Sequence, residues 1–261
     1  MPAPDVAVAP EAAPAAPPTR PLLSLHDHPP ATLAGLLLHS RYTVPALAGA
    51  FLLLAIAAAI NGGSLLQTWD EPVQRWVESQ RTDAFDSFFK FISGFGGLTT
   101  VLTGLVVLLA LVYRLCRPLA IALIVASAAR PLIEWTLKAS VDRARPDFDR
   151  LVPGNGPSFP SGHVMAAIAV WGLVPPVVAL CTNRRVWWWI ATATSGVIIL
   201  LVGASRIYLG VHWFSDVVGA LMFGALYLLA VELLFDAAHH RYGCATRGHV
   251  LRPPPRAPST A

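Results

Sequence analysis

The connector at residues 205–216, SRIYLGVHWFSD, holds three ionisable side chains between two long apolar runs. They are Arg206, His212 and Asp216. His212 precedes Asp216 by four residues, so a helix that begins near His212 would place the carboxylate on the same face as the imidazole. There the carboxylate can fix the tautomer of the imidazole and orient its ring. An oriented neutral imidazole is a nucleophile that can attack phosphorus.

A second polar segment, KASVDRARP at 138–146, contributes Lys138 and Arg145. With Arg206 these residues make three cations that the chain could bring to one place. Arginine presents a planar fork of N–H donors that matches the oxygens of a phosphate group. The three cations therefore predict a binding site for a tetrahedral oxyanion.

A third segment, PSGH at 160–163, stands directly before an apolar run. Ser161 offers a hydroxyl, and Gly162 allows the backbone to approach a ligand closely. A helix that begins here would present free N–H groups and the positive end of its dipole to an anion. His163 could protonate a leaving oxygen, because an imidazole pKa of about 6.5 suits general-acid work near neutrality. Alone, each histidine would be interpreted as a packed or interfacial side chain; the prediction depends on the three segments together.

Neither a metal nor a cofactor is expected at this site. Too few carboxylates converge to hold magnesium, and His163 and His212 lack an obvious third ligand for zinc. Nucleic acid is not an expected partner either, although the net charge is +4. The lysines and arginines form no continuous basic stripe, and no basic motif interleaved with aromatic residues occurs.

The composition indicates the elements that must position these residues. The chain of 261 residues is 55% hydrophobic and only 13% charged, against about 25% charged residues in a soluble domain. Its mean hydropathy is +0.57. A helix needs about 17–25 apolar residues to cross a bilayer. Six runs approach that length: 43–60, 98–115, 118–137, 163–181, 187–204 and 214–235. A large soluble core is a poorer interpretation, since too little polar surface remains to cover six such helices.

The expected fold is therefore an all-α polytopic membrane protein with a bundle of six transmembrane helices. After the first run, Leu66, Trp69, Val73, Trp76 and Val77 recur at helical spacing. The polar Asp70, Glu71, Arg75 and Glu78 are placed elsewhere around this helix. Two interpretations remain open: an amphipathic helix on the membrane surface with tryptophan at the interface, or a hydrophobic cap over the bundle.

Charges at membrane depth normally face the bundle interior and pair with one another. Arg130, Glu134 and Lys138 recur every four residues in the third run, hence on one helix face. We expect Arg130 and Glu134 to form a structural pair, and whether the pair also tunes Lys138 stays open.

The distribution of basic residues predicts the topology. Ten of the 19 lysines and arginines lie in the two tails and the second and fourth loops. Eight lie on the other side, and three of these, Lys138, Arg145 and Arg206, belong to the polar site. By the positive-inside rule, both termini are cytoplasmic and the site is extracytoplasmic. We expect a disordered Pro/Ala-rich tail at 1–41, a phosphate-binding membrane unit at 42–236 and a basic tail at 237–261.

The three polar segments together resemble the type 2 phosphatidic acid phosphatases, the lipid-phosphatase branch of a superfamily shared with vanadium haloperoxidases. That family has Lys-x6-Arg-Pro, Pro-Ser-Gly-His and Ser-Arg-x5-His-x3-Asp, and this chain matches each pattern without departure. The resemblance implies a phosphohistidine on His212, supported by Asp216, with His163 as acid and then as base for water. It also implies that five residues hold the phosphate: Lys138, Arg145, Ser161, Gly162 and Arg206.

The resemblance implies a metal-independent phosphatase that acts on a lipid phosphate within the membrane. Phosphatidic acid, phosphatidylglycerol phosphate and polyprenyl pyrophosphate share the phosphate end that the motifs bind, so the substrate stays open. The outward-facing site and the compact chain are most similar to bacterial members that act on polyprenyl pyrophosphate or phosphatidylglycerol phosphate. Two alternatives remain: a haloperoxidase that holds vanadate, and a protein that binds or transports lipid phosphates without turnover. The sequence does not indicate an oligomeric state.

Overall fold

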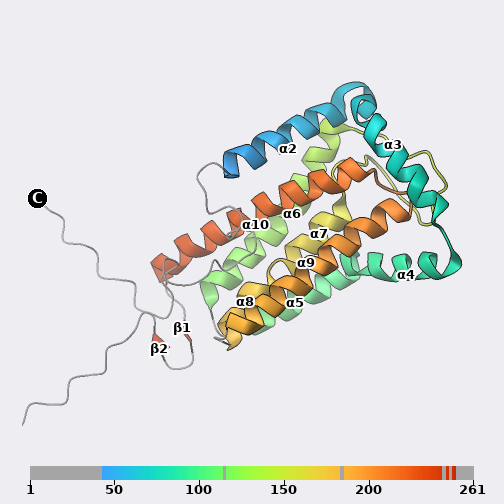
Figure 1. Ribbon diagram of the computed structural model, residues 1–261. Helices are drawn as coiled ribbons and strands as arrows, with labels where there is room; N and C mark the ends of the chain where they lie inside the picture. The colour runs from blue at the N-terminus through green and yellow to red at the C-terminus, as the bar shows by residue number, and fades with distance from the viewer. Residues whose placement is uncertain (1–42, 114–115, 183–184, 243–244, 247–248, 251–261) are drawn as a thin grey trace, which may run out of the picture.

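The structure is a computed structural model that describes residues 43–113, 116–182, 185–242, 245–246 and 249–250 (Figure 1). The expected tail at 1–41 lies outside these residues, as does much of the expected tail at 237–261. The elements in chain order are α2 (Thr43–Ala59), the 3₁₀-helix η1 (Ile60–Gly63), α3 (Ser64–Ser79), α4 (Asp83–Ser93), the 3₁₀-helix η2 (Gly94–Gly96), α5 (Leu98–Tyr113), α6 (Arg117–Val141), α7 (Gly162–Trp171), α8 (Val174–Thr182), α9 (Arg185–Tyr208), α10 (Phe214–Tyr242), β1 (Ala245–Thr246) and β2 (His249–Val250). The described chain is thus all-helical apart from one antiparallel pair of two-residue strands.

Within the residues that the structure describes, each of the six apolar runs lies mostly on helix. In the described part of the chain, four helical segments are long and apolar enough to cross a membrane: Thr43–Ser79, Ala120–Val141, Val186–Tyr208 and Phe214–Leu234. A fifth candidate is the pair Asp83–Gly96 and Leu98–Tyr113, which is bent by 44°, and Gly162–Val178 is a shorter apolar stretch. These lengths agree with the expected polytopic membrane protein, with four or five candidate spans where the sequence predicted six.

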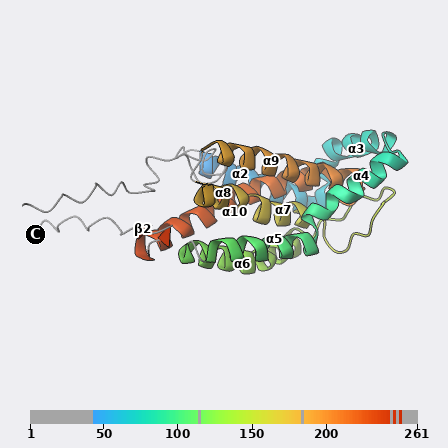
Figure 2. The same cartoon turned by 90° about the horizontal axis from the view of Figure 1, so that it is seen from below.

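Helix α7 forms the centre of the bundle and contacts α5, α6, α9 and α10 (Figures 1 and 2). Every residue from Val164 to Val170 is buried, which explains why this helix is apolar on all sides. The faces of the outer helices that point away from α7 carry exposed apolar side chains. Among them are Leu52 and Leu53 on α2, Val106 and Val107 on α5, and Ile124 and Val125 on α6. Such faces suit contact with lipid rather than water.

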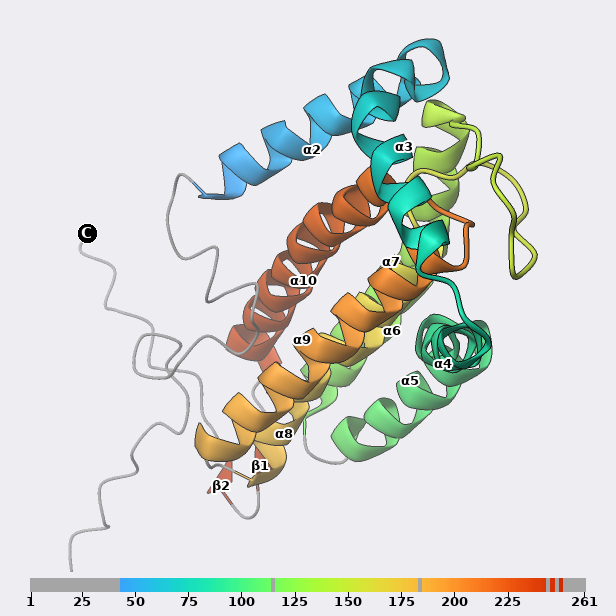
Figure 3. The same cartoon turned by 45° about the vertical axis from the view of Figure 1, so that its right-hand side comes forward.

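One end of the bundle gathers the segments that carry the predicted chemistry (Figures 1 and 3). It consists of α3, α4, the irregular segment 142–161 between α6 and α7, and the short connector between α9 and α10. The C-terminal ends of α5, α8 and α10 and the N-terminal ends of α6 and α9 lie at the other end. The fold therefore brings the three polar motifs to one end, as the alternation of helices and loops predicts.

Helix α3 lies across this end and covers the C-terminal end of α9, whose last carbonyls lack partners within their own helix. Gln74 Nε2 donates to the Ile207 carbonyl at 3.2 Å, and Arg81 donates to the Tyr208 carbonyl at 3.1 Å. Trp69 and Trp76 point away and are 75% and 64% exposed.

The structure buries one residue of α3 that was expected away from the apolar residues of this helix. Asp70 was placed on the polar side, but it is fully buried. It shares the inward face with Gln74, Val73 and Val77, of which the two valines pack against the hydrophobic core. The inward face of α3 is therefore partly polar.

Candidate active site

His212 lies in the turn between α9 and α10, and its ring is bracketed by a cation and a carboxylate. Its Nε2 is 3.2 Å from Arg145 Nη1, and its Nδ1 is 3.5 Å from Asp216 Oδ2. Helix α10 begins at Phe214, two residues later than the alignment of His212 and Asp216 on one helix would need. The two side chains still meet, because Asp216 sits in the first turn of α10 and its Oδ2 accepts the Trp213 N–H at 2.9 Å. This contact is one half of a helix capping box, in which a side chain in the first turn accepts the backbone N–H of the residue before the helix.

The contacts of His212 define its tautomer. A guanidinium can only donate, so Nε2 accepts from Arg145, and the single ring proton is on Nδ1 facing Asp216. Burial lowers the pKa of His212 to about 4, against the opposing effect of Asp216. The imidazole is therefore neutral near pH 7, and its Nε2 lone pair is directed at the arginine that would hold a phosphate.

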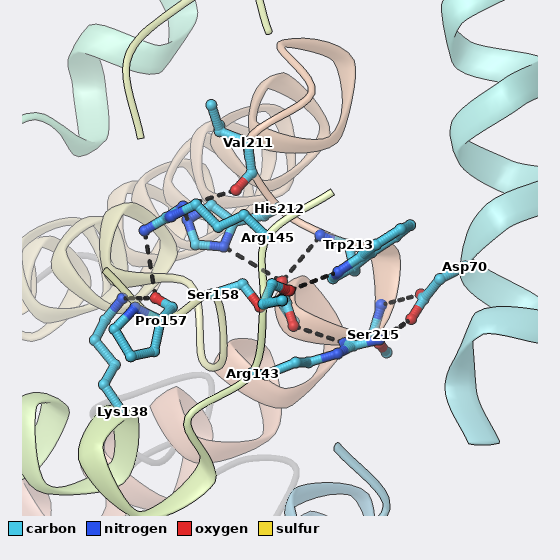
Figure 4. Close-up of polar contacts among 12 residues, drawn as sticks. Asp70, Lys138, Arg143, Arg145, Pro157, Ser158, Val211, His212, Trp213 and Ser215 are labelled. Atoms are coloured by element: carbon cyan, nitrogen blue, oxygen red, sulfur yellow. Dashed lines mark hydrogen bonds and ion pairs between the residues drawn. The ribbon is translucent and has the colours of Figure 1, made fainter. Parts of the chain in front are cut away.

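Backbone carbonyls of the irregular segment 142–161 hold Arg145 and Lys138. Arg145 donates to the carbonyls of Asn155 at 2.8 Å, Gly156 at 2.9 Å and Pro157 at 3.3 Å, and to that of Val211 at 2.7 Å. Lys138 Nζ donates to the Pro157 carbonyl at 3.0 Å (Figure 4). The Pro157 carbonyl thus joins the two cations, and burial lowers the pKa of Arg145.

Arg206 is buried at the end of α9 beside His212. Its Nη1 donates to Ser93 Oγ at 2.5 Å, from the last residue of α4. Its own carbonyl accepts the N–H groups of Val211 and His212 at 3.2 and 3.3 Å. This tight turn fixes the spacing between Arg206 and His212. Ser93 could not be identified from the sequence, because this contact joins segments 113 residues apart.

The PSGH motif forms the start of α7. Ser161 is the N-cap residue and makes no side-chain cap, so its buried Oγ has no hydrogen-bond partner among the described residues. Gly162 makes room for Glu134, since a Cβ at this position would collide with the Glu134 carboxylate. Glu134 in turn accepts from Arg130 at 2.6 Å and lies 3.9 Å from Lys138 Nζ. The pair expected between Arg130 and Glu134 is present, and it extends to Lys138.

These groups surround a cavity of about 430 Å³. Six of the eight predicted site residues line it: Lys138, Arg145, Gly162, His163, Arg206 and His212. The other two lie behind the wall. Asp216 is fully buried behind His212, and Ser161 is fully buried beside Gly162. Leu98, Val101 and Ala166 form an apolar part of the wall.

Arg143 is a residue that the sequence did not single out. It lies two positions before Arg145, and its side chain is completely buried. Its guanidinium donates to Ser215 and Asp70 (Figure 4) and also to Asp216. Nothing in the sequence separates this arginine from a surface cation. Among the described residues, no three His, Cys, Asp or Glu side chains converge as metal ligands.

Comparisons with known proteins show what the chain as a whole is similar to. Residues 100–239 match the family model described as the PAP2 superfamily. The chain is 33% identical over 189 residues to phosphatidylglycerophosphatase B of Bacillus subtilis (strain 168), covering 70% of this chain and 91% of that protein. It is 28% identical over 130 residues to the protein named "Putative undecaprenyl-diphosphatase YbjG" of Escherichia coli (strain K12), covering 48% of this chain and 61% of that protein. The crystal structure of a PAP2-type phosphatidylglycerolphosphate phosphatase from Bacillus subtilis superposes with a TM-score of 0.66 at 28% identity, covering 77% of this chain and 99% of that one.

Proposed function

Because the chain belongs to the PAP2 superfamily and is a membrane lipid phosphatase of that superfamily, we propose that it hydrolyses a lipid phosphate or pyrophosphate through a phosphohistidine on His212. The observation that carries this mechanism is the bracketing of His212. Its Nε2 accepts from Arg145 at the cavity wall while its Nδ1 faces the buried Asp216. A neutral imidazole held in this way has its lone pair where a phosphorus atom would bind.

The reaction has two steps. In the first, His212 Nε2 forms a bond to phosphorus, the bond to the leaving oxygen breaks, and His163 donates its proton to that oxygen. In the second, His163 takes a proton from water, the water oxygen attacks phosphorus, and the bond to Nε2 breaks. Inorganic phosphate leaves, and both histidines return to their starting protonation states.

Stabilisation of the transition state comes from the positive groups around the cavity. Lys138, Arg145 and Arg206 line it, and α7 begins at Gly162, so its free N–H groups and dipole add to their field. Groups that are already held in place cost no reorganisation as negative charge develops. The carbonyls of 155–157 and Ser93 supply this preorganisation for Arg145, Lys138 and Arg206.

A lipid is the substrate class that fits this cavity, since the wall formed by Leu98, Val101 and Ala166 can receive the start of an apolar chain. We propose phosphatidylglycerol phosphate, polyprenyl pyrophosphate and phosphatidic acid as substrates to compare, the first two in keeping with the relatives' names. The test is release of inorganic phosphate from each lipid by purified protein in one detergent preparation. Binding of these lipids without release would instead support a binding or transport protein.

A haloperoxidase is the remaining alternative, because the same cations could hold vanadate. An assay of halide oxidation with added vanadate and peroxide separates the two functions. We expect phosphate release and no halide oxidation above the rate without protein.

Activity is expected to survive chelation. Three cationic side chains supply the charge that a metal ion would otherwise supply, and the one carboxylate among the residues lining the cavity, Glu134, is paired with Arg130. Full phosphate release after treatment with EDTA is the predicted result. Vanadate, which can adopt the geometry of a phosphorane, should inhibit in competition with substrate. Loss of activity in EDTA that magnesium restores would contradict the metal-free mechanism.

For the membrane arrangement, we propose six spans, with α7 and α8 together as the fourth. Their 10 and 9 residues, with the break between them, reach roughly 30 Å at ~1.5 Å per residue. The exposed Trp69 and Trp76 support an α3 that lies on the membrane surface with its tryptophans at the interface. We propose 42–236 as the phosphatase unit, from which α10 continues to Tyr242.

We further propose that both termini are cytoplasmic and that the cavity opens at the outer face. Ten basic residues lie in the segments assigned to the cytoplasm. Arg143 is buried, so it is not counted among the basic residues on the outer side. The residues that remain there to indicate the orientation of the protein in the membrane are Arg75, Arg81, Lys90 and Arg150. A phosphatase reporter that works only outside the cell, fused after Ala261, should be inactive, whereas a cytoplasmic reporter at the same position should be active. The reverse pattern would invert the proposed orientation.

A further inference from the structure

A buried polar cluster lies behind the active site and outside its cavity. Its members are Asp70 from α3, Arg143 from the segment after α6, and Ser215 and Asp216 from the first turn of α10. Asp70, Arg143 and Asp216 are at most 1% exposed, and Ser215 is 7% exposed. None of the four lines the cavity. Buried charges of this kind are costly unless they are paired, and here Arg143 forms ion pairs with both Asp70 and Asp216.

Asp70 acts as a cap for α10, although it is 145 residues away in the chain. Its Oδ1 accepts the Ser215 N–H at 2.8 Å, and its Oδ2 accepts the Ser215 hydroxyl at 2.5 Å. The first N–H groups of a helix lack partners within the helix, and a carboxylate there also suits the helix dipole. Helix α3 therefore holds the start of α10, the turn that carries Asp216.

Arg143 joins the two carboxylates. Its Nη2 donates to Asp70 Oδ2 at 2.7 Å, and its Nη1 donates to Asp216 Oδ1 at 2.8 Å and to Ser215 Oγ at 2.7 Å. Its position is defined from two further sides. The guanidinium lies 5.5 Å from the centre of the Trp213 ring, and Gly63, at φ +86°, leaves it space that a Cβ would fill.

We propose that Asp70 and Arg143 are positioning residues that hold Asp216, and through it His212, in the geometry for attack. This inference rests on the proposed role of His212 as nucleophile. Asp216 has only two oxygens: Oδ2 faces Trp213 N and His212 Nδ1, while Oδ1 faces Arg143. Without the Oδ1 partner the carboxylate is free to rotate, and the imidazole loses the contact that aims Nε2 at phosphorus. Both residues act on the chemical step without touching substrate.

The primary test compares Asp70→Asn with Glu71→Gln, its neighbour on the same helix, in purified full-length protein with a lipid phosphate that the wild type hydrolyses. Asp70→Asn should lower kcat by about 10²-fold, the loss typical of a displaced catalytic group, with KM changed less than about twofold. Glu71, which pairs with Arg75 at the surface, should be dispensable for both parameters. Circular dichroism and thermal melting establish that each variant is folded.

A double-mutant cycle distinguishes positioning from damage to the fold. If Asp70 acts through Asp216, it should have little left to contribute once Asp216 is replaced. Asp70→Asn should therefore lower kcat by less than about threefold in an Asp216→Asn background. Arg143→Lys keeps the charge but cannot bridge both carboxylates, and should retain more activity than Arg143→Gln.

The pH profile of kcat/KM gives a second readout, since its acid limb reports protonation of His212 in the free enzyme. The charged groups that face His212 are Asp216 on α10, Arg145 on the segment after α6 and Arg206 on α9, with His163 on α7 as a further titratable neighbour. Asp70→Asn removes a negative charge that lies behind these groups. The pKa of His212 should then fall, and the acid limb of kcat/KM should move to lower pH. Arg143→Gln removes positive charge and should move it to higher pH.

Opposite shifts from the two ends of one ion pair are not expected from general loosening of the protein. The inference is overturned if Asp70→Asn keeps wild-type kcat, if KM rises while kcat is unchanged, or if the losses are additive with Asp216→Asn. If wild-type protein releases no phosphate from any lipid tested, the proposed function fails instead, and the two failures are distinct.

Discussion

Replacement of His212 by alanine is expected to abolish phosphate release and to abolish any phosphoenzyme. No other nucleophile is held as His212 is, with Nε2 at the cavity wall beside Arg145 and Nδ1 facing Asp216, among the residues that the structure describes. An activated substrate cannot compensate, because the missing bond is the first one to form. Phosphate release and trapped phosphoryl protein are the two measurements.

His249→Ala is the matched control for this variant, because His249 lies in the C-terminal strand pair β1–β2. It should have wild-type activity. Near-normal turnover by His212→Ala, with its helical circular dichroism intact, would show that another group attacks phosphorus.

The second large effect is that of His163→Ala, and its size should depend on the leaving group. His163 lines the cavity at the start of α7, and we propose it as the group that protonates the leaving oxygen. Loss of a general acid typically costs about 10²–10⁴-fold, and an alkoxide needs that proton most. For an alkyl phosphate, kcat/KM should fall by this factor. For p-nitrophenyl phosphate, whose leaving group departs without a proton, the fall in kcat/KM should be much smaller.

This prediction is made for kcat/KM because kcat/KM reports the steps up to release of the leaving group, whereas kcat also includes hydrolysis of the phosphoenzyme. His163 is assigned to both steps, so kcat on the aryl substrate should stay low. An equal loss of kcat/KM on the alkyl and aryl phosphates would remove His163 from the role of acid.

The helices and the grouping of the motifs could be predicted from the sequence because each has a local cause. An apolar run of sufficient length forms a helix in a membrane, and connections that alternate between two ends bring every second loop together. For this reason Lys138, Arg145, His163, Arg206 and His212 were expected at one end, and they line one cavity.

The break between α7 and α8 has a less visible cause. The run at 163–181 looks continuous, yet α7 ends at Trp171 and α8 begins at Val174. Pro175 and Pro176 suit the first turn of α8, where their missing N–H groups cost nothing, and this placement is clear only once the end of α7 is known. Hydropathy alone does not report such a break.

The buried network could not be predicted, because tertiary contacts determine which polar groups are buried. Arg143 and Arg145 are two residues apart and could not be distinguished by their charge. In the structure Arg143 is buried in the interior, whereas Arg145 lines the cavity. For Asp70 a signal existed. Asp70, Val73, Gln74 and Val77 share one helical face, so the aspartate could have been placed on the inward side. What it pairs with there depends on residues 73 and 145 positions away.

The central claim is that phosphorus is transferred to His212, and His163→Ala with p-nitrophenyl phosphate tests it most directly. Attack on this substrate needs little general acid, while hydrolysis of the phosphoenzyme lacks its base, so the intermediate should accumulate. Rapid mixing is predicted to release a burst of about one p-nitrophenolate per enzyme, with an alkali-stable, acid-labile phosphoryl group on the peptide that contains His212. Slow release without a burst and with no phosphoryl group on that peptide, or a phosphoryl group on a different residue, would contradict the account.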